Sequence, residues 1–205
     1  MNMSSPVEMA TARPLRADAD RNRRAVITAA ERLFAERGFD VPLGAVAAAA
    51  GVGRATLYRH FSTRTDLAFA LFERDMQRLR DFAASQKGEP GDFEELIGFK
   101  LQCYIRSGGL AEAVQRESRS VDFAKEREEI AGLFWRAAQP AMNAGVLRSD
   151  LTIESFLMLD LAISGVMLSG GTVADRRERA ERLKSMLLDG LRCCSGVKQA
   201  PVPEG

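Results

Sequence analysis

The stretch that decides the fold covers residues 43–61 and reads LGAVAAAAGVGRATLYRHF. Pro42 suits the first turn of a short helix, where its missing N–H is no loss, and apolar side chains then recur on one face. Gly51 ends this helix, and Gly53 can serve as the N-cap of a second helix over 54–60. Two short helices joined by a three-residue turn that contains glycine predict a helix-turn-helix.

The outer face of the predicted second helix carries hydrogen-bond donors. Val46, Ala47 and Leu57 can fill the seam between the two helices, which turns the other side of the second helix outward. Arginine can bind guanine bidentately in the major groove, while threonine, tyrosine and histidine can bond phosphate oxygens. We therefore predict contact with double-stranded DNA by Arg54, Thr56, Tyr58, Arg59 and His60.

A possible anion site opens the next helix. Thr63 and Asp66 have the spacing of an N-terminal capping pair. Arg64 then lies in the first turn, where the helix dipole disfavours a cation. A DNA phosphate would explain this arginine, because the backbone amides at a helix start also attract anions. Thr63 and Arg64 are therefore also predicted to contact DNA.

A longer helix is predicted before this motif, over about 20–37, and Gly38 follows it as glycine follows a helix C-terminus. Residues 1–17 mix serine, proline, methionine and alanine without a period, so we expect a disordered tail with Arg13 and Arg16 as a basic arm. The apolar positions of the helix are Val26, Ile27, Ala30, Leu33 and Phe34.

The rest of the chain is also predicted to be helical. Four segments show helical periodicity, and the second can also be two helices. They cover about 92–107, 110–138, 153–169 and 175–193. No alternating strand pattern interrupts them, so the fold class is all-α. We expect an N-terminal three-helix helix-turn-helix domain over 18–66, a C-terminal helical bundle for ligand binding and dimerisation over 67–195, and a flexible tail over 196–205.

Apolar residues of the C-terminal domain indicate a dimer and a ligand pocket. The helix after Thr152 is apolar on nearly every side, so it needs cover on every side, and a second subunit can supply part of it. The expected homodimer interface comprises Phe156, Ile163, Met167, Leu183, Leu187 and Leu191. Methionine and aromatic side chains would suit a pocket for an apolar or aromatic small molecule. The pocket candidates are Phe99, Cys103, Phe123, Trp135 and Met158.

Composition narrows the class of protein. With 205 residues, of which 46% are hydrophobic, the chain can bury a sizeable core. It shows no bilayer-spanning run and no secretory signal, so we expect a cytoplasmic protein without a membrane partner. The net charge is only +1, but residues 1–66 carry ten arginines and no lysine against seven acidic residues. The basic excess therefore lies at the predicted DNA-binding end.

Other chemistries find little support in the sequence. His60 is the single histidine, which excludes histidine-rich metal sites and a Ser-His-Asp triad elsewhere, so we expect no metal and no cofactor. The two glycines at 51 and 53 lack the third glycine and the preceding strand of a dinucleotide site. Cys193 and Cys194 are typical of inert or partly exposed thiols, and a redox role for them stays open.

The motif resembles the DNA-binding domain of the tetracycline-repressor (TetR) family over about residues 22–72. The resemblance rests on AAERLFAERGF followed by VPLGAVAAAAGVGRATLYRHFSTRTDL, in which GVGRATLYRHFSTR is the specific part. Residues 140–151 are similar to the stretch before the dimerising helices of the family. By this resemblance Arg64 matches a phosphate-binding lysine, and the residues that touch bases or phosphates are Arg54, Thr56, Tyr58 and His60.

The sequence departs from the family pattern at the start of the first short helix. Pro42 and Leu43 stand where many members carry a serine or threonine that caps the helix and meets a phosphate. Gly44 removes a long polar side chain from a position that can reach the groove. We therefore expect sequence readout mostly from the second short helix.

The predicted function is a DNA-binding transcriptional regulator. It would be a repressor that binds a pseudo-palindromic operator as a dimer and is released by an unknown small-molecule effector. One alternative is an all-helical enzyme, against which stand the single histidine and the lack of a phosphate loop. The other is a helical ligand-binding or adaptor protein with a weakened DNA-binding face, which the departures at 42–44 leave open.

Overall fold

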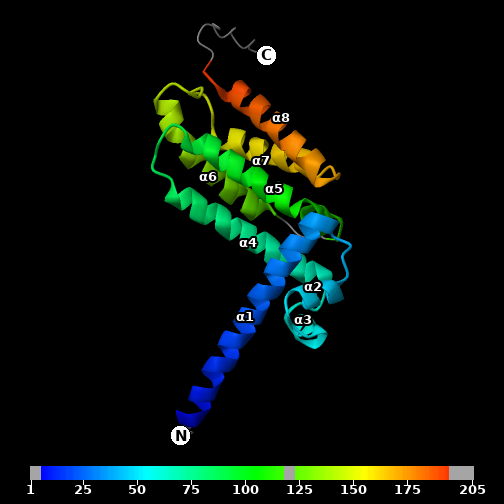
Figure 1. The fold of residues 1–205 in the computed structure, drawn as a ribbon. Coiled ribbons are helices and arrows are strands. Elements are labelled where there is room, and N and C mark those ends of the chain that lie inside the picture. The colour runs from blue at the N-terminus through cyan, green and yellow to red at the C-terminus, as the bar shows by residue number, and fades with distance from the viewer. Residues whose placement is uncertain (1–5, 118–122, 194–205) are drawn as a thin grey trace. The chain divides into compact units, whose positions relative to one another are not determined.

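The computed structural model describes residues 6–117 and 123–193, and within them every regular element is a helix (Figure 1). This confirms the all-α fold class. None of the helices in this part of the chain is long and apolar enough to cross a membrane. The helices are α1 (Pro6–Arg37), α2 (Leu43–Ala49), α3 (Arg54–His60), α4 (Arg64–Ser85), α5 (Asp92–Glu117), α6 (Ala124–Asn143), α7 (Ile153–Met167) and α8 (Val173–Leu191).

The chain divides into two compact units that do not follow the chain order. The first unit comprises Met1–Gln77, Cys103–Val121 and Leu168–Arg176. The second unit comprises Arg78–Gln102, Asp122–Met167 and Arg177–Gly205. Helices α4 and α5 each contribute to both units. The predicted domain boundary between residues 66 and 67 falls inside the first turn of α4, and the division into DNA-binding and ligand-binding domains stays a prediction.

Helix α1 begins earlier than the sequence pattern indicated. It starts at Pro6 rather than near 20, so residues 6–17, expected as part of a disordered tail, are helical. Seven of the twelve residues over 6–17 are alanine, arginine, methionine or leucine, and their helix propensity does not need an amphipathic period. Residues 1–5 of the expected tail, the expected tail over 196–205 and Cys194 lie outside the described residues.

The expected break near residue 109 is also wrong. Helix α5 continues through the glycine pair at 108–109 to Glu117, and α6 begins only at Ala124. The expected segment over 110–138 therefore holds parts of two helices, as the second of the two interpretations of this segment predicted. Glycine lowers helix propensity by only about 1 kcal/mol, a weak preference that the surrounding fold can override.

The first unit is built around the apolar stripe of α1. All five predicted positions are buried: Val26, Ile27, Ala30, Leu33 and Phe34. Helices α2 and α3 pack against α1 and against each other (Figure 1). Gly38, which follows α1, takes a φ of +83° and so ends the helix as predicted.

The second unit has an aromatic core. Phe93 of α5 meets Phe134 of α6 and Phe156 of α7 edge to face, with ring centroids 6.0 and 5.4 Å apart. Such pairs are favoured by the opposite charge of ring edge and ring face. Helix α7 starts after Thr152, which caps it: the amide of Ser155 donates to the hydroxyl of Thr152 over 3.4 Å. This cap sets where α7 begins its passage across α6.

Candidate nucleic-acid interface

The turn between α2 and α3 has the geometry that its glycines predicted. Gly51 takes a φ of +68°, a left-handed conformation that glycine adopts without strain. The amide of Gly51 donates to the carbonyl of Ala48 over 3.1 Å, and that of Val52 donates to the carbonyl of Ala47 over 3.0 Å. These two bonds form a Schellman motif. Gly53 is the N-cap of α3, as predicted.

One face of α3 is buried against α1 and α2. Leu57 has no exposed surface and Phe61, which follows the helix, keeps 2%. Val46 and Ala47 of α2 are buried as well. From α1, the guanidinium carbon of Arg23 lies 5.2 Å from the centre of the Phe61 ring, a cation–π contact. This packing leaves the polar face of α3 directed outward.

The outward face carries three of the predicted DNA contacts. Arg54, Tyr58 and Arg59 are exposed, and Tyr58 keeps 51% of its surface, which is high for an aromatic side chain. Thr56 is half-buried. The exposed donors lie on one short helix and have the chemistry that phosphates and base edges accept.

His60 does not lie on the open face where we expected it. The side chain is half-buried, and its Nε2 has almost no accessible surface and no hydrogen-bond partner. His60 occupies the last turn of α3, next to the buried Phe61, with the two ring centroids 6.4 Å apart. The expected outward position is therefore wrong, and Nε2 can meet a phosphate only after the ring moves.

The capping pair at the start of α4 is confirmed. The amide of Thr63 donates to the Asp66 carboxylate over 2.9 Å, and the amide of Asp66 donates to the Thr63 hydroxyl over 3.0 Å. The Thr63 hydroxyl accepts in this pair, so its own proton stays available for a phosphate.

Arg64 has an internal partner that the sequence did not reveal. Its Nη1 donates to the carbonyl of Phe39, and its guanidinium carbon lies 5.3 Å from the centre of the Phe39 ring. The cation in the first turn of α4 is therefore partly explained without DNA. A guanidinium has five N–H donors, so the contact with a phosphate stays a prediction.

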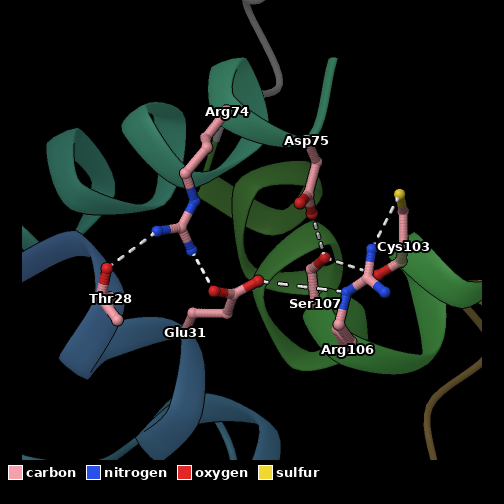
Figure 2. A network of polar contacts seen from close by, with 7 residues as sticks. All are labelled: Thr28, Glu31, Arg74, Asp75, Cys103, Arg106 and Ser107. Atoms are coloured by element: carbon pink, nitrogen blue, oxygen red, sulfur yellow. Dashed lines mark hydrogen bonds and ion pairs between the residues drawn. The ribbon is translucent and has the colours of Figure 1, made fainter. Parts of the chain in front are cut away.

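A polar network joins α1, α4 and α5 inside the first unit (Figure 2). The carboxylate of Glu31 on α1 forms an ion pair with Arg74 of α4 and lies 4.0 Å from Nε of Arg106 on α5. Arg74 also donates to the hydroxyl of Thr28 over 3.4 Å. Only 19% of the Glu31 side chain is exposed, and the two arginines supply the opposite charge that a partly buried carboxylate needs.

The same network continues between α4 and α5. Ser107 donates its hydroxyl to the carboxylate of Asp75, and its oxygen lies 2.6 Å from the carbonyl oxygen of Cys103 (Figure 2). Sequence reasoning missed both the ion pairs of Glu31 and the contact between Ser107 and Asp75. Their partners lie 32 to 75 positions apart, and such contacts leave no local signal in a single sequence.

Three of the predicted dimer-interface residues lie in the core of the single chain. Phe156, Ile163 and Met167 keep at most 1% of their surface, so a second subunit has nothing left to cover. Helix α7 packs on α6, and Phe156 contacts Trp135 of α6 and Phe93 of α5. A helix that is apolar on almost every side does not reveal beforehand which side will be buried. Leu183, Leu187 and Leu191 are half-buried, and their interface role stays a prediction.

Apart from Val146, which lies in the loop before α7, the exposed large apolar side chains among the described residues of the second unit lie on α7 and α8. On α7 they sit at intervals of three to five residues and keep between 37% and 64% of their surface. We call these residues the apolar face: Ile153, Met158, Leu161 and Val166 of α7, and Met186 of α8.

The five pocket candidates do not all lie in the interior. Met158 is 64% exposed and belongs to the apolar face, so its predicted place in an interior pocket is wrong. Phe99 stacks on Phe82 with the rings 4.4 Å apart, and Trp135 meets Phe156 edge to face at 5.9 Å. Cys103 is buried one helical turn after Phe99 on α5, and Phe123 is half-buried just before α6. A pocket role for these four stays a prediction.

A buried ion pair crosses the core of the second unit. Nζ of Lys100 on α5 lies 3.2 Å from Oδ1 of Asp160 on α7, and the two side chains keep only 8% and 2% of their surface. Sequence reasoning did not single out this pair. A signal was present, because Asp160 is a lone charge inside the otherwise apolar run FLMLDLAISGVM.

Comparisons with known proteins agree with this site. The sequence model described as "Bacterial regulatory proteins, tetR family" matches residues 26–71. An HTH-type transcriptional regulator of Staphylococcus aureus strain USA300 is 36% identical over 114 residues, which are 53% of this chain and 62% of that protein. The aligned region therefore covers less than two thirds of this relative.

Solved structures extend the likeness to most of the chain. A TetR transcriptional regulator from Streptomyces coelicolor is 30% identical, with 84% of this chain and 99% of that chain covered and a TM-score of 0.62. A gamma-butyrolactone receptor described as ArpA-like is 22% identical, with coverage of 87% and 92% and a TM-score of 0.52, and shows the shared fold. The glycine turn, the outward donors of α3 and this full-length likeness together show that the chain belongs to the TetR family of transcriptional regulators.

Proposed function

We propose that this protein is a repressor that binds a pseudo-palindromic operator as a homodimer and is released by a small-molecule effector. The observation that carries the proposal is the outward face of α3. Arg54, Tyr58 and Arg59 are exposed there, while Leu57 anchors the opposite side of the same helix in the core. A helix held this rigidly can place donors in the major groove without first paying much conformational entropy.

The apolar face supports the dimer. Four large apolar side chains are exposed on the single helix α7, more than the scattered exposed residues that any surface carries, and such a cluster supports an interaction site there. A second copy presenting the same face would cover it in an isologous contact. Two recognition helices about 34–36 Å apart would then meet successive major grooves on one side of the duplex.

Release by an effector is supported by the fold and by the connectivity. A gamma-butyrolactone receptor has the same fold, so this helical arrangement can serve a receptor for a small ligand. Helices α4 and α5 run from one compact unit into the other, and α4 starts beside the recognition helix. A ligand that favours one arrangement of these helices would change operator affinity by about 5–150-fold, the usual range of such coupling.

The test starts from DNA selected by the purified full-length protein from a random duplex pool. Affinity for the selected duplex is then measured at several salt concentrations for wild type, Arg54→Ala/Tyr58→Ala and Arg177→Ala, which removes an exposed arginine of α8. We expect the double variant to lose affinity and the Arg177 variant to match wild type. The logarithm of affinity should fall linearly with the logarithm of salt, by about 0.9 per phosphate contact.

Failure to enrich any duplex, or an affinity that does not respond to salt, would contradict the proposal. It would favour the second candidate, a helical ligand-binding or adaptor protein with a weakened DNA-binding face. One observation speaks for that candidate: Pro42 is the N-cap of α2 and makes no side-chain hydrogen bond there. The hydroxyl that could cap this helix and meet a phosphate is absent.

A further inference from the structure

Gly44 and Arg54 approach each other unusually closely across the helix-turn-helix. A Cβ atom placed on Gly44 would lie 3.1 Å from both Nε and Nη2 of Arg54 and 3.3 Å from its Cζ. All three distances are tighter than ordinary van der Waals contact. The guanidinium of Arg54, the first residue of α3, therefore lies against the bare backbone of α2 at Gly44.

This contact fills a position that α2 leaves empty. The sequence of α2, LGAVAAA, holds no polar side chain, so the helix itself offers no side-chain donor to DNA. The guanidinium of Arg54 reaches back over the first turn of α2 and supplies donors at that place. Arg54 stays exposed, so its guanidinium is accessible to DNA.

We propose that Gly44 is a specificity-determining positioning residue: by lacking a side chain it seats the Arg54 guanidinium over α2, where this arginine reads a guanine. The inference rests on the proposed function and deepens it. Residues at the N-terminal end of a recognition helix contact base edges, and Arg54 holds the first position. The arginine fork fits guanine O6 and N7 bidentately. A side chain with many rotamers that is held in place before binding loses less conformational entropy when it binds the DNA.

The substitution Gly44→Ala separates an effect on the position of the Arg54 guanidinium from an effect on the stability of the protein. The new Cβ displaces the guanidinium from its place on α2 by a few tenths of an ångström, while alanine favours a helix more than glycine does. The thermal midpoint of unfolding should therefore stay the same or rise, although DNA binding weakens. Gly132→Ala on α6 is the matched control, because its Cβ would lie 3.7 Å from Nη1 of Arg136, an ordinary contact.

The experiment compares wild type, Gly44→Ala, Arg54→Ala, the double variant and Gly132→Ala. The probes are the duplex that wild type selects from a random pool and a duplex of unrelated sequence. A bidentate contact to guanine is worth about 5–150-fold in affinity, and we expect Gly44→Ala to lose at least 5-fold on the selected duplex only. In the Arg54→Ala background, Gly44→Ala should change affinity less than 2-fold, because the group it displaces is gone.

Selection from the random pool is then repeated with each variant. Gly44→Ala and Arg54→Ala should lose preference at the same guanine and retain it elsewhere. An affinity of Gly44→Ala equal to wild type, or losses that multiply in the double variant, would overturn the inference. Equal weakening on both duplexes would mean that Arg54 meets a phosphate, and would overturn it as well. If wild type enriches no duplex, the proposed function itself fails; the other outcomes leave that function standing.

Discussion

Replacing Lys100 with methionine leaves the Asp160 carboxylate without its counter-ion inside the second unit. The two side chains keep 8% and 2% of their surface, and the charged atoms are 3.2 Å apart. At that separation the attraction between unit charges is about 5 kcal/mol for an effective dielectric constant near 20. Most of this gain is offset by the lost hydration of both ions, so the intact pair adds little net stability.

Removing Lys100 leaves the desolvation cost of the buried Asp160 carboxylate uncompensated. A buried charge that loses its partner destabilises a protein by about 3–5 kcal/mol, a large part of the 5–15 kcal/mol that holds a typical domain folded. We expect this loss for Lys100→Met. The double variant Lys100→Met/Asp160→Leu should return to wild-type stability or exceed it, because an apolar pair has no charge to desolvate.

Urea unfolding followed by circular dichroism measures these free energies. All variants are compared at one protein concentration, since the stability of a dimer depends on concentration. Lys184→Met is the control: Lys184 lies 3.1 Å from Glu94, but these side chains keep 30% and 51% of their surface. Its loss should stay below about 1 kcal/mol. A loss as small for Lys100→Met, or a double variant as unstable as the single one, would refute the reasoning.

Three further predictions concern charge, pH and assembly. Hydrogen bonds from Arg80 lower the pKa of Glu129. This carboxylate therefore adds stability above its unfolded pKa of about 4.3, and that stability is lost as pH falls through the lower folded pKa. The difference in thermal midpoint between wild type and Glu129→Gln should shrink from pH 6 to pH 3, and a constant difference would contradict this prediction. Glu31→Gln should destabilise by about 1–3 kcal/mol in urea unfolding because it removes an ionised partner of two arginines, whereas the same change at the exposed Glu36 should cost less than about 0.5 kcal/mol. Leu161→Lys, at a side chain that is 46% exposed, should give a folded monomer in analytical ultracentrifugation; an unchanged dimer would place the interface elsewhere.

Local features of the site could be predicted from the sequence because their partners lie within a few residues. The left-handed Gly51, the N-cap at Gly53 and the Thr63–Asp66 pair all follow from groups at most five positions apart. The apolar stripe of α1 was equally clear, because a single buried face produces a regular period. These signals identified the helix-turn-helix and the direction of its polar face.

Contacts between distant residues could not be predicted in this way. Nothing near Arg64 indicates that it bonds the Phe39 carbonyl, and nothing near Glu31 indicates its two arginines on other helices. Helix α7 is the sharpest case, since it is apolar on almost every side. Its sequence indicated that it is covered but not which side lies in the core of the single chain, so buried Phe156 was assigned to the dimer interface and exposed Met158 to the ligand pocket.

The sequence alone thus determined the helices of the DNA-binding motif, their caps and the residue types offered to a nucleic acid, because hydrogen bonds within one or two turns decide these features. Tertiary structure alone decided which side chains of α7 remain exposed, that Lys100 and Asp160 share the core, and that Arg54 rests on Gly44. Each of these depends on the packing of one helix against another, and that packing leaves no period in either helix on its own.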